Sequence, residues 1–241
     1  MIAPPGARVL LLDVEGTTTD VSFVHEVLFP WARARLGEFL RARGAGPEVR
    51  ADLEALRAER AGETGPGAPP WVGGADESSS AAAYAAWLMD RDRKSTALKS
   101  LQGRIWEEGY QAGALRAHVW ADVRPALERW RAQGGLVAIF SSGSVLAQRL
   151  LFAHTVEGDL TALVDDYFDT TTGPKREAES YRRIADSLRV APSTVLFVSD
   201  VVAELDAARA AGLGTALAVR GAEPAETGGH PVLRSFDALR P

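Results

Sequence analysis

Two carboxylates, Asp13 and Glu15, directly follow a short apolar run at residues 9–12. A carboxylate in this position can attack phosphorus as a nucleophile and form an acyl phosphate. Its oxygens are also the kind of ligand that Mg²⁺ binds. Glu15 can give a proton to a leaving oxygen and then take one from water. An ordinary polar loop after a strand would have the same residues, so this motif alone leaves the two interpretations even.

Ser141 and Ser142 directly follow a second apolar run at residues 136–140. Hydroxyls and successive backbone N–H groups at a strand end, next to the N-terminus of a helix, can bind an anion such as phosphate. Capping of the next helix by Ser142 or Ser144 is the alternative, and for this motif alone it is the favoured one.

Lys175 and Asp200 complete the set of residues that could do chemistry. A lysine aimed at the same place would offset the repulsion between an anionic nucleophile and phosphate, although most lysines lie at the surface. Asp200 follows a third apolar run at 195–198 and can complete a metal site with Asp13. Glu204, one helical turn later, can orient Lys175 or support the metal, and a normal helix start also explains it. The order of all these motifs along the chain favours a phosphoryl-transfer site, because capping has no reason to produce the complete set.

These side chains need a scaffold that brings several strand ends together. Helical patterns at 145–152, 179–188 and 201–211 adjoin the apolar runs, and a weaker run at 215–219 follows. Strands that alternate with helices predict an α/β fold with a doubly wound parallel sheet. Ligands of such sheets bind at the carboxyl ends of the strands, so we expect the polar residues there to converge.

The segment between the first two apolar runs is helical in pattern and contains a Gly/Pro-rich loop at 62–77. We therefore predict an α/β core made of residues 1–21 and 119–241, with a helical cap inserted at 22–118.

Composition limits the function further. The 241 residues include no cysteine, which excludes disulfides, thiolate zinc sites and cysteine nucleophiles. The formal net charge of −5, without a basic stripe, argues against a nucleic-acid partner. No uncharged apolar stretch reaches the length of about 18 residues that indicates a membrane span, and no secretory signal is evident. We expect a cytoplasmic monomer with no membrane partner.

The sequence resembles the haloacid dehalogenase superfamily of phosphotransferases and, within it, the enolase-phosphatases of methionine salvage. Five segments carry the resemblance, and they include part of the predicted cap: 11–32, 97–110, 139–160, 168–188 and 196–212. Together they are far more specific than the two-acid signature of the superfamily. The Gly/Pro-rich loop departs from this pattern, and no cap residue is assigned to the methylthio group of the substrate.

The resemblance implies a role for each site residue. Asp13 would be the nucleophile, and Asp13 and Asp200 would bind one Mg²⁺ per subunit together with the backbone carbonyl of Glu15. Glu15 would be the general acid and base, at a position where most superfamily members have aspartate. The positions that bind phosphate in the family correspond to Ser141, Ser142 and Lys175.

The resemblance also implies a substrate, the small phosphorylated diketone 2,3-diketo-5-methylthiopentyl-1-phosphate. The family enolises it and then removes the phosphate, which gives the acireductone 1,2-dihydroxy-3-keto-5-methylthiopentene. Glu15 is our hypothesis for the enolisation base, and His25 receives no role. Two alternatives stay open: a related phosphatase of another small phosphate ester, and a non-enzymatic, phospho-accepting regulatory domain of the receiver type.

Overall fold

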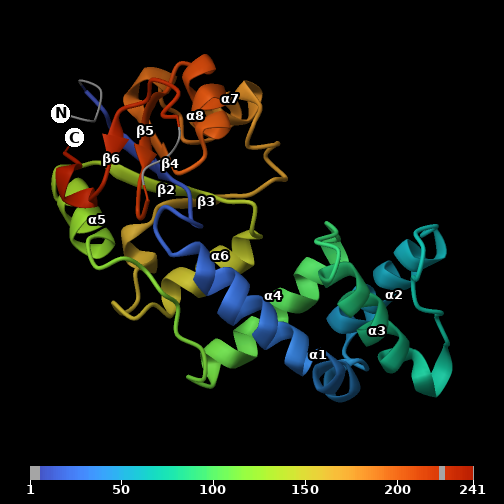
Figure 1. The fold of residues 1–241 in the computed structure, drawn as a ribbon. Coiled ribbons are helices and arrows are strands. Elements are labelled where there is room, and N and C mark those ends of the chain that lie inside the picture. The colour runs from blue at the N-terminus through green and yellow to red at the C-terminus, as the bar shows by residue number, and fades with distance from the viewer. Residues whose placement is uncertain (1–5, 223–225, 241) are drawn as a thin grey trace. The chain divides into compact units, whose positions relative to one another are not determined.

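The computed structural model describes residues 6–222 and 226–240. The chain divides into two compact units (Figure 1). The first unit runs to Val24 and resumes at Arg116, and the second unit is His25–Leu115. The sequence pattern placed the junctions at 21/22 and 118/119. That the second unit acts as a cap stays a prediction.

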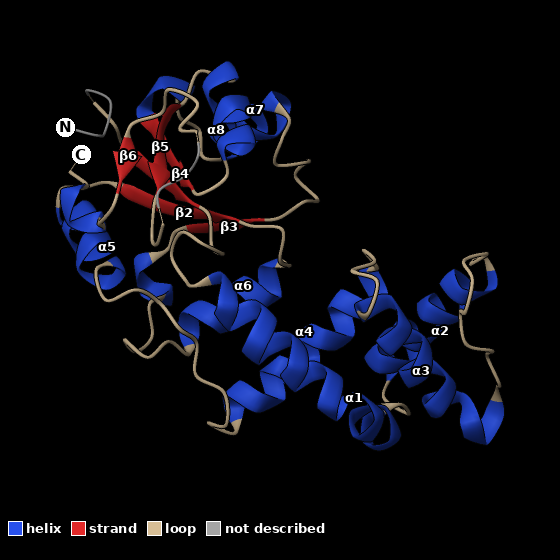
Figure 2. Cartoon of the chain, viewed as in Figure 1, coloured by secondary structure: helices blue, strands red, loops and turns tan. Residues whose placement is uncertain are grey.

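The first unit is built on one parallel sheet, whose strands are red in Figure 2. Its six strands lie in the order β3-β2-β1-β4-β5-β6. All neighbouring strands pair in parallel. This sheet confirms the predicted doubly wound α/β fold. The strands are β1 Val9–Leu12, β2 Leu136–Phe140, β3 Asp166–Phe168, β4 Val195–Ser199, β5 Gly214–Ala218 and β6 Val232–Leu233.

The central strand β1 pairs with β2 on one side and with β4 on the other, and the ends of these three strands lie level with one another. Leu12 pairs with Ile139 of β2 and with Val198 of β4. Every residue of β1 is buried, as expected of a strand that is covered on both faces of a parallel sheet. The residues that follow the three strands therefore lie side by side along one edge of the sheet.

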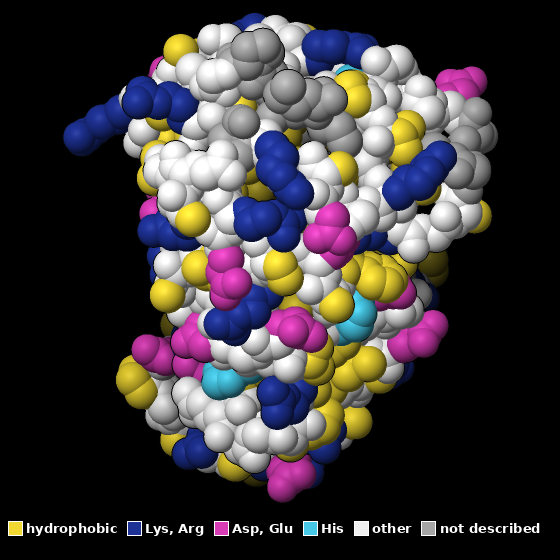
Figure 3. All heavy atoms as spheres, turned by 90° about the vertical axis from the view of Figure 1, so that its left-hand side faces the viewer, with side chains coloured by type: hydrophobic (Ala, Val, Ile, Leu, Met, Phe, Trp, Pro, Cys, Tyr) yellow, Lys and Arg dark blue, Asp and Glu magenta, His cyan; other side chains and the backbone are white. Residues whose placement is uncertain are grey.

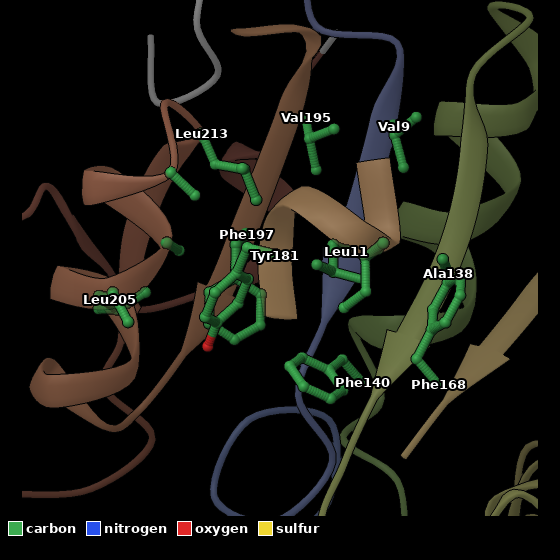
Figure 4. Packing of buried hydrophobic residues seen from close by; sticks show 14 of the residues in the cluster. Val9, Leu11, Ala138, Phe140, Phe168, Tyr181, Val195, Phe197, Leu205 and Leu213 are labelled. Carbon is green, nitrogen blue, oxygen red and sulfur yellow. The ribbon is translucent and has the colours of Figure 1, made fainter. Parts of the chain in front are cut away.

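Helices cover the sheet of the first unit. On one face, Tyr181 and Leu205 belong to the same buried cluster as Leu11, Phe140 and Phe197 (Figure 4). The α-helices are α5 Val123–Ala132, α6 Val145–Ala153, α7 Ala178–Ser187 and α8 Val202–Ala210, and the 3-10 turns are η3 Thr161–Leu163, η4 Pro192–Thr194 and η5 Phe236–Ala238.

The second unit is helical. Its core is formed by fully buried side chains such as Leu40, Leu56, Tyr84 and Leu101. Its elements are α1 Phe29–Arg43, α2 Pro47–Ala61, the 3-10 turn η2 Gly74–Asp76, α3 Glu77–Met89 and α4 Thr96–Gln111. The segment before α1, η1 Phe23–Leu28, is a π-helix and not a regular α-helix. Pro30 explains the interruption, because it has no backbone N–H to donate to the preceding turn.

Two further global features bear on possible partners. Within residues 6–222 and 226–240, none of the helices combines the length and apolar character that crossing a membrane requires. On the face that Figure 3 shows, basic and acidic side chains lie interspersed.

Candidate active site

Asp13 begins the loop that follows β1, which we call the Asp13 loop (residues 13–20). Its side chain is buried, and Oδ1 accepts a hydrogen bond from the backbone N–H of Val14 at 2.7 Å. The backbone N–H groups of the three threonines at 17–19 all donate to the carbonyl of Val14, at 3.3, 2.9 and 3.0 Å. These bonds hold the loop in a tight turn, so the Asp13 carboxylate has a fixed position.

Gly16 lies directly against Asp200. Its φ of +73° lies in the left-handed region, and a Cβ at this position would be 2.1 Å from Oδ2 of Asp200. The backbone N–H of Asp200 donates to the hydroxyl of Thr17 at 3.1 Å. The structure therefore brings the two predicted metal-binding residues, Asp13 and Asp200, together through one loop.

Lys175 is buried and lies between two carboxylates. Its Nζ is 2.6 Å from Oδ1 of Asp13 and 2.7 Å from Oε2 of Glu204. The Tyr181 hydroxyl donates to the Lys175 carbonyl at 2.7 Å, which holds the backbone that carries this side chain. Burial lowers the pKa of Lys175, but the charges of Asp13 and Glu204 raise it above its ordinary value. The ammonium is therefore charged, and Lys175 is not a surface lysine.

Ser199, the last residue of β4, joins the same group. Its hydroxyl lies 3.1 Å from Oδ2 of Asp13 and 3.1 Å from Oε2 of Glu204. Sequence reasoning assigned Ser199 no role and missed this link. The link follows from the register of β1 against β4, which places Ser199 level with Asp13 and which no motif in the sequence indicates.

The two predicted phosphate-binding serines follow β2, the other neighbour of β1. Ser141 is buried, and its hydroxyl accepts the backbone N–H of Gly143 at 3.0 Å. The helix α6 is capped by Ser144, whose hydroxyl accepts the backbone N–H of Ala147 at 3.3 Å. Ser144 therefore accounts for the capping that we considered for Ser142. A contact of Ser141 and Ser142 with phosphate stays a prediction.

The far end of the Asp13 loop is held by His118 and Trp120. The backbone N–H of Asp20 donates to Nδ1 of His118 at 3.1 Å. The backbone N–H of Trp120 donates to the carbonyl of Thr18 at 3.1 Å. Sequence reasoning assigned neither residue to the site. His25 belongs to the second unit, where its ring packs edge-on against Phe29.

The charges of the site are unbalanced. Four carboxylates, those of Asp13, Glu15, Asp200 and Glu204, crowd around the single ammonium of Lys175. Burial and the Asp13 charge raise the pKa of Glu15 to about 7 and that of Asp200 to about 6. The same two causes raise the pKa of Glu204. Crowded acids with raised pKa values are typical of functional sites, and they also occur in structural ion-pair networks.

This donor set fits Mg²⁺. No three His, Asp or Glu side chains in the described part of the chain stand close enough to hold a metal by themselves. Mg²⁺ usually keeps several waters and takes one or two carboxylates from the protein. Asp13 and Asp200 can supply these, and the third predicted ligand at Glu15 is a backbone carbonyl. The excess negative charge suits a divalent cation.

A cavity of about 330 Å³ lies next to this group within the first unit. Gly16, Asp20, Trp120, Asp200 and Arg220 are among the residues that line it. Part of a ligand that reaches Asp200 would therefore find room beside the Asp13 loop.

Comparison with known proteins adds to this geometry. The family model of haloacid dehalogenase-like hydrolases matches residues 7–212. The chain is similar to an enolase-phosphatase E1 of Synechococcus elongatus, with 53% identity over 99% of this chain and 100% of the relative. It is 52% identical to an enolase-phosphatase E1 of Sorangium cellulosum over 98% of both chains.

Solved structures show the same similarity. The UTR4 protein of Saccharomyces cerevisiae matches with a TM-score of 0.79 and 33% identity, over 97% of this chain and 100% of the yeast chain. A dehalogenase structure matches with a TM-score of 0.56 at 20% identity, over 97% of this chain and 95% of that one, and shows the shared fold alone.

Proposed function

Because the chain belongs to the enolase-phosphatase family of the haloacid dehalogenase-like hydrolases, we propose that it converts 2,3-diketo-5-methylthiopentyl-1-phosphate to the acireductone and phosphate. The observation that carries the proposal is the buried ammonium of Lys175, 2.6 Å from the carboxylate of Asp13. A buried cation beside a fixed carboxylate would offset the repulsion between that carboxylate and an anionic phosphate ester.

Asp13 is the nucleophile. Three contacts hold its carboxylate: the Val14 N–H and Lys175 at Oδ1, and the Ser199 hydroxyl at Oδ2. A carboxylate held in one orientation can attack in line with the leaving oxygen and form an aspartyl phosphate. The ion pair with Lys175 also draws negative charge away from the face that meets the phosphate.

Glu15 is the general acid and base. A pKa of about 7 lets its carboxyl group hold a proton for the leaving oxygen and lose it again near neutral pH. The resulting carboxylate then takes a proton from the water that hydrolyses the aspartyl phosphate. The same carboxylate is our hypothesis for the base that removes the C1 proton during enolisation.

Asp13, Asp200 and the backbone carbonyl of Glu15 would hold one Mg²⁺ per subunit. When bound, this ion would offset negative charge on the transferring phosphoryl group and steady the enolate. The phosphate oxygens would meet Lys175, together with the hydroxyls and N–H groups of Ser141 and Ser142 before α6. The second unit would act as the cap, and we expect a monomer in the cytoplasm.

The ultraviolet absorbance of the enol intermediate and of the acireductone tests this function. The wild type with Mg²⁺ should form both species from the diketone phosphate and release phosphate. Asp13→Asn should release none. Asp166→Asn is a matched control, because the Asp166 carboxylate also accepts the N–H of the next residue, at 2.8 Å, but lies at the start of β3. It should retain activity.

Three results would contradict parts of the proposal. Rapid turnover of other phosphate esters without either absorbing species would favour a different phosphatase. Stable phosphorylation without turnover would favour a phospho-accepting regulatory domain. A Glu15→Gln variant that still enolises but does not dephosphorylate would remove Glu15 as the enolisation base and keep it as the acid.

A further inference from the structure

Arg220 lies just beyond β5 in the first unit, and its side chain is only 10% exposed. Its Nε donates to the carbonyl of Thr17 at 2.9 Å, and its Nη1 pairs with Oδ2 of Asp122 at 2.6 Å. The guanidinium also lies over the ring of Phe236, 4.4 Å from the ring centre. Arg220 therefore joins the Asp13 loop to the start of α5 and to the C-terminal segment.

Thr17 connects this guanidinium to the site. Its side chain is fully buried inside the Asp13 loop. Its carbonyl accepts the bond from Arg220, and its hydroxyl accepts the backbone N–H of Asp200 at 3.1 Å. A displacement of Thr17 would therefore move Asp200, whose carboxylate already lies against Gly16. Thr17 is thus a direct hydrogen-bonded link between the Asp13 loop and Asp200, in addition to the pairing of β1 with β4.

The ion pair between Arg220 and Asp122 is unusual for its place in the fold. Asp122 stands at the N-cap of α5, where an aspartate normally accepts a backbone N–H of the helix, but it makes no such bond. Its Oδ2 accepts instead from Arg220 and from the backbone N–H of Phe236 at 2.8 Å.

The pair is also a poor source of stability. Nη2 of Arg220 is buried and has no hydrogen-bond partner among residues 6–222 and 226–240. A buried ion pair with an unsatisfied donor contributes little net stability, because the cost of removing both charges from water offsets their attraction. A role in geometry accounts for the pair better than a role in stability.

We propose that Arg220 is a positioning residue that acts through Thr17 to fix Asp200 at the distance from Asp13 that metal binding needs. The hydrogen bonds and the ion pair of Arg220 go to Thr17 and Asp122, and not to the carboxylates of Asp13 or Asp200. The inference rests on the proposed function, because that function assigns Asp13 and Asp200 to the metal.

The test measures Mn²⁺ binding to the purified, metal-free full chain, without substrate, from the electron paramagnetic resonance signal of free Mn²⁺. The wild type should bind one ion. Arg220→Gln should raise the Kd by about tenfold or more, as is typical when a group that orients a metal ligand is lost.

Arg129→Gln is the matched control. Arg129 donates to the carbonyl of Phe236 at 3.1 Å and lies 3.6 Å from Asp237, so its loss loosens the same C-terminal segment as Arg220→Gln. These contacts hold Arg129 to the C-terminal segment and do not involve the Asp13 loop. The Kd of this variant should equal that of the wild type. Equal Kd values for Arg220→Gln and Arg129→Gln would overturn the inference.

Variants of Thr17 test the other end of the link and do not depend on the folding of Arg220→Gln. Thr17→Val removes the hydroxyl and should raise the Kd about tenfold, whereas Thr17→Ser should bind like the wild type. The double variant Arg220→Gln/Thr17→Val should bind no more weakly than the weaker single variant, because both changes break one link.

Two further outcomes are decisive. Multiplied effects in the double variant, or an unchanged Kd in Thr17→Val, would overturn the inference while the metal site stands. A wild type that binds no Mn²⁺ would remove the metal assignment in the proposed function and this inference with it.

Discussion

Lys175→Met replaces the only ammonium among four carboxylates by an apolar side chain of similar length. The side chain of Lys175 is 6% exposed, and its two partners, Asp13 and Glu204, are 4% and 11% exposed. The variant therefore leaves both carboxylates without their cation, in a place that water hardly reaches.

The size of the effect follows from this burial. Removal of one partner from a buried ion pair costs about 3–5 kcal/mol of unfolding free energy, because an uncompensated charge stays behind. Glu15 and Asp200 are partly exposed to solvent, which weakens their repulsion with the two uncompensated carboxylates. We therefore expect a loss of unfolding free energy at the lower end of this range, about 3 kcal/mol at pH 8. A domain is stable by only about 5–15 kcal/mol, so the loss is large and measurable.

The loss should also depend on pH. The charge of Lys175 lowers the pKa of Glu15, Asp200 and Glu204, so each of these pKa values rises further in the variant. Between the unfolded and the raised folded pKa values, the folded variant holds more protons than the unfolded chain. Its stability therefore falls as pH rises. Each unit of additional pKa shift changes the unfolding free energy by about 1.4 kcal/mol. Relative to the wild type, the variant should therefore lose less unfolding free energy at pH 5 than at pH 8.

Urea unfolding of the metal-free protein at pH 5 and pH 8 measures both quantities. Lys94→Met, at an exposed position of the second unit, is the control and should match the wild type at both pH values. The argument from crowded carboxylates would be refuted if Lys175→Met lost the same unfolding free energy at pH 5 and pH 8. It would also be refuted if Lys175→Met lost no more than Lys94→Met.

Three other predictions concern the same group of elements. Gly16→Ala should lower the unfolding free energy by about 1–2 kcal/mol because of the positive φ. It should also lose most activity, because its Cβ would meet Asp200. Gly134→Ala, the control, also has a positive φ but no atom within 4 Å of its Cβ, so it should lose stability and keep activity. Leu11→Ala, in the fully buried centre of β1, should lower the unfolding free energy by about 2–5 kcal/mol in urea titrations. Mg²⁺ at a hundred times its Kd should stabilise the wild type by about 2.7 kcal/mol in thermal unfolding and Asp200→Asn by much less, and equal stabilisation would count against the proposed ligands.

The apolar runs made the main strands predictable. The runs at 9–12, 136–140 and 195–198 correspond to β1, β2 and β4, because a strand covered on both faces needs apolar residues throughout. The strands β3 and β6 were missed. They have three and two residues, which is too short for any periodic pattern.

The candidate site was most directly predictable where a residue follows a strand. Asp13, Ser141 and Asp200 do so, and the parallel sheet brings these strand ends to one edge. Lys175, which directly follows no strand, was predicted from its place in the order of the motifs. The links of Ser199 and Arg220 depend on register and on side-chain direction across residues far apart in the chain. A single sequence shows neither the register of the strands nor the direction of these side chains. No sequence motif marks an arginine that is buried and binds a backbone carbonyl.

The anchors of the site explain how the fold maintains so unfavourable a charge arrangement. Asp13 is held by its own loop, Asp200 by the Thr17 hydroxyl and Lys175 by the hydroxyl of Tyr181. Thr17 and Tyr181 are themselves fully buried, which limits how far the charged residues can move apart to relieve their repulsion. The core thus keeps the site in a geometry that a cation would stabilise. It follows that substitutions which relieve the repulsion should stabilise the metal-free protein and weaken its binding of Mg²⁺, because both effects have the same electrostatic origin.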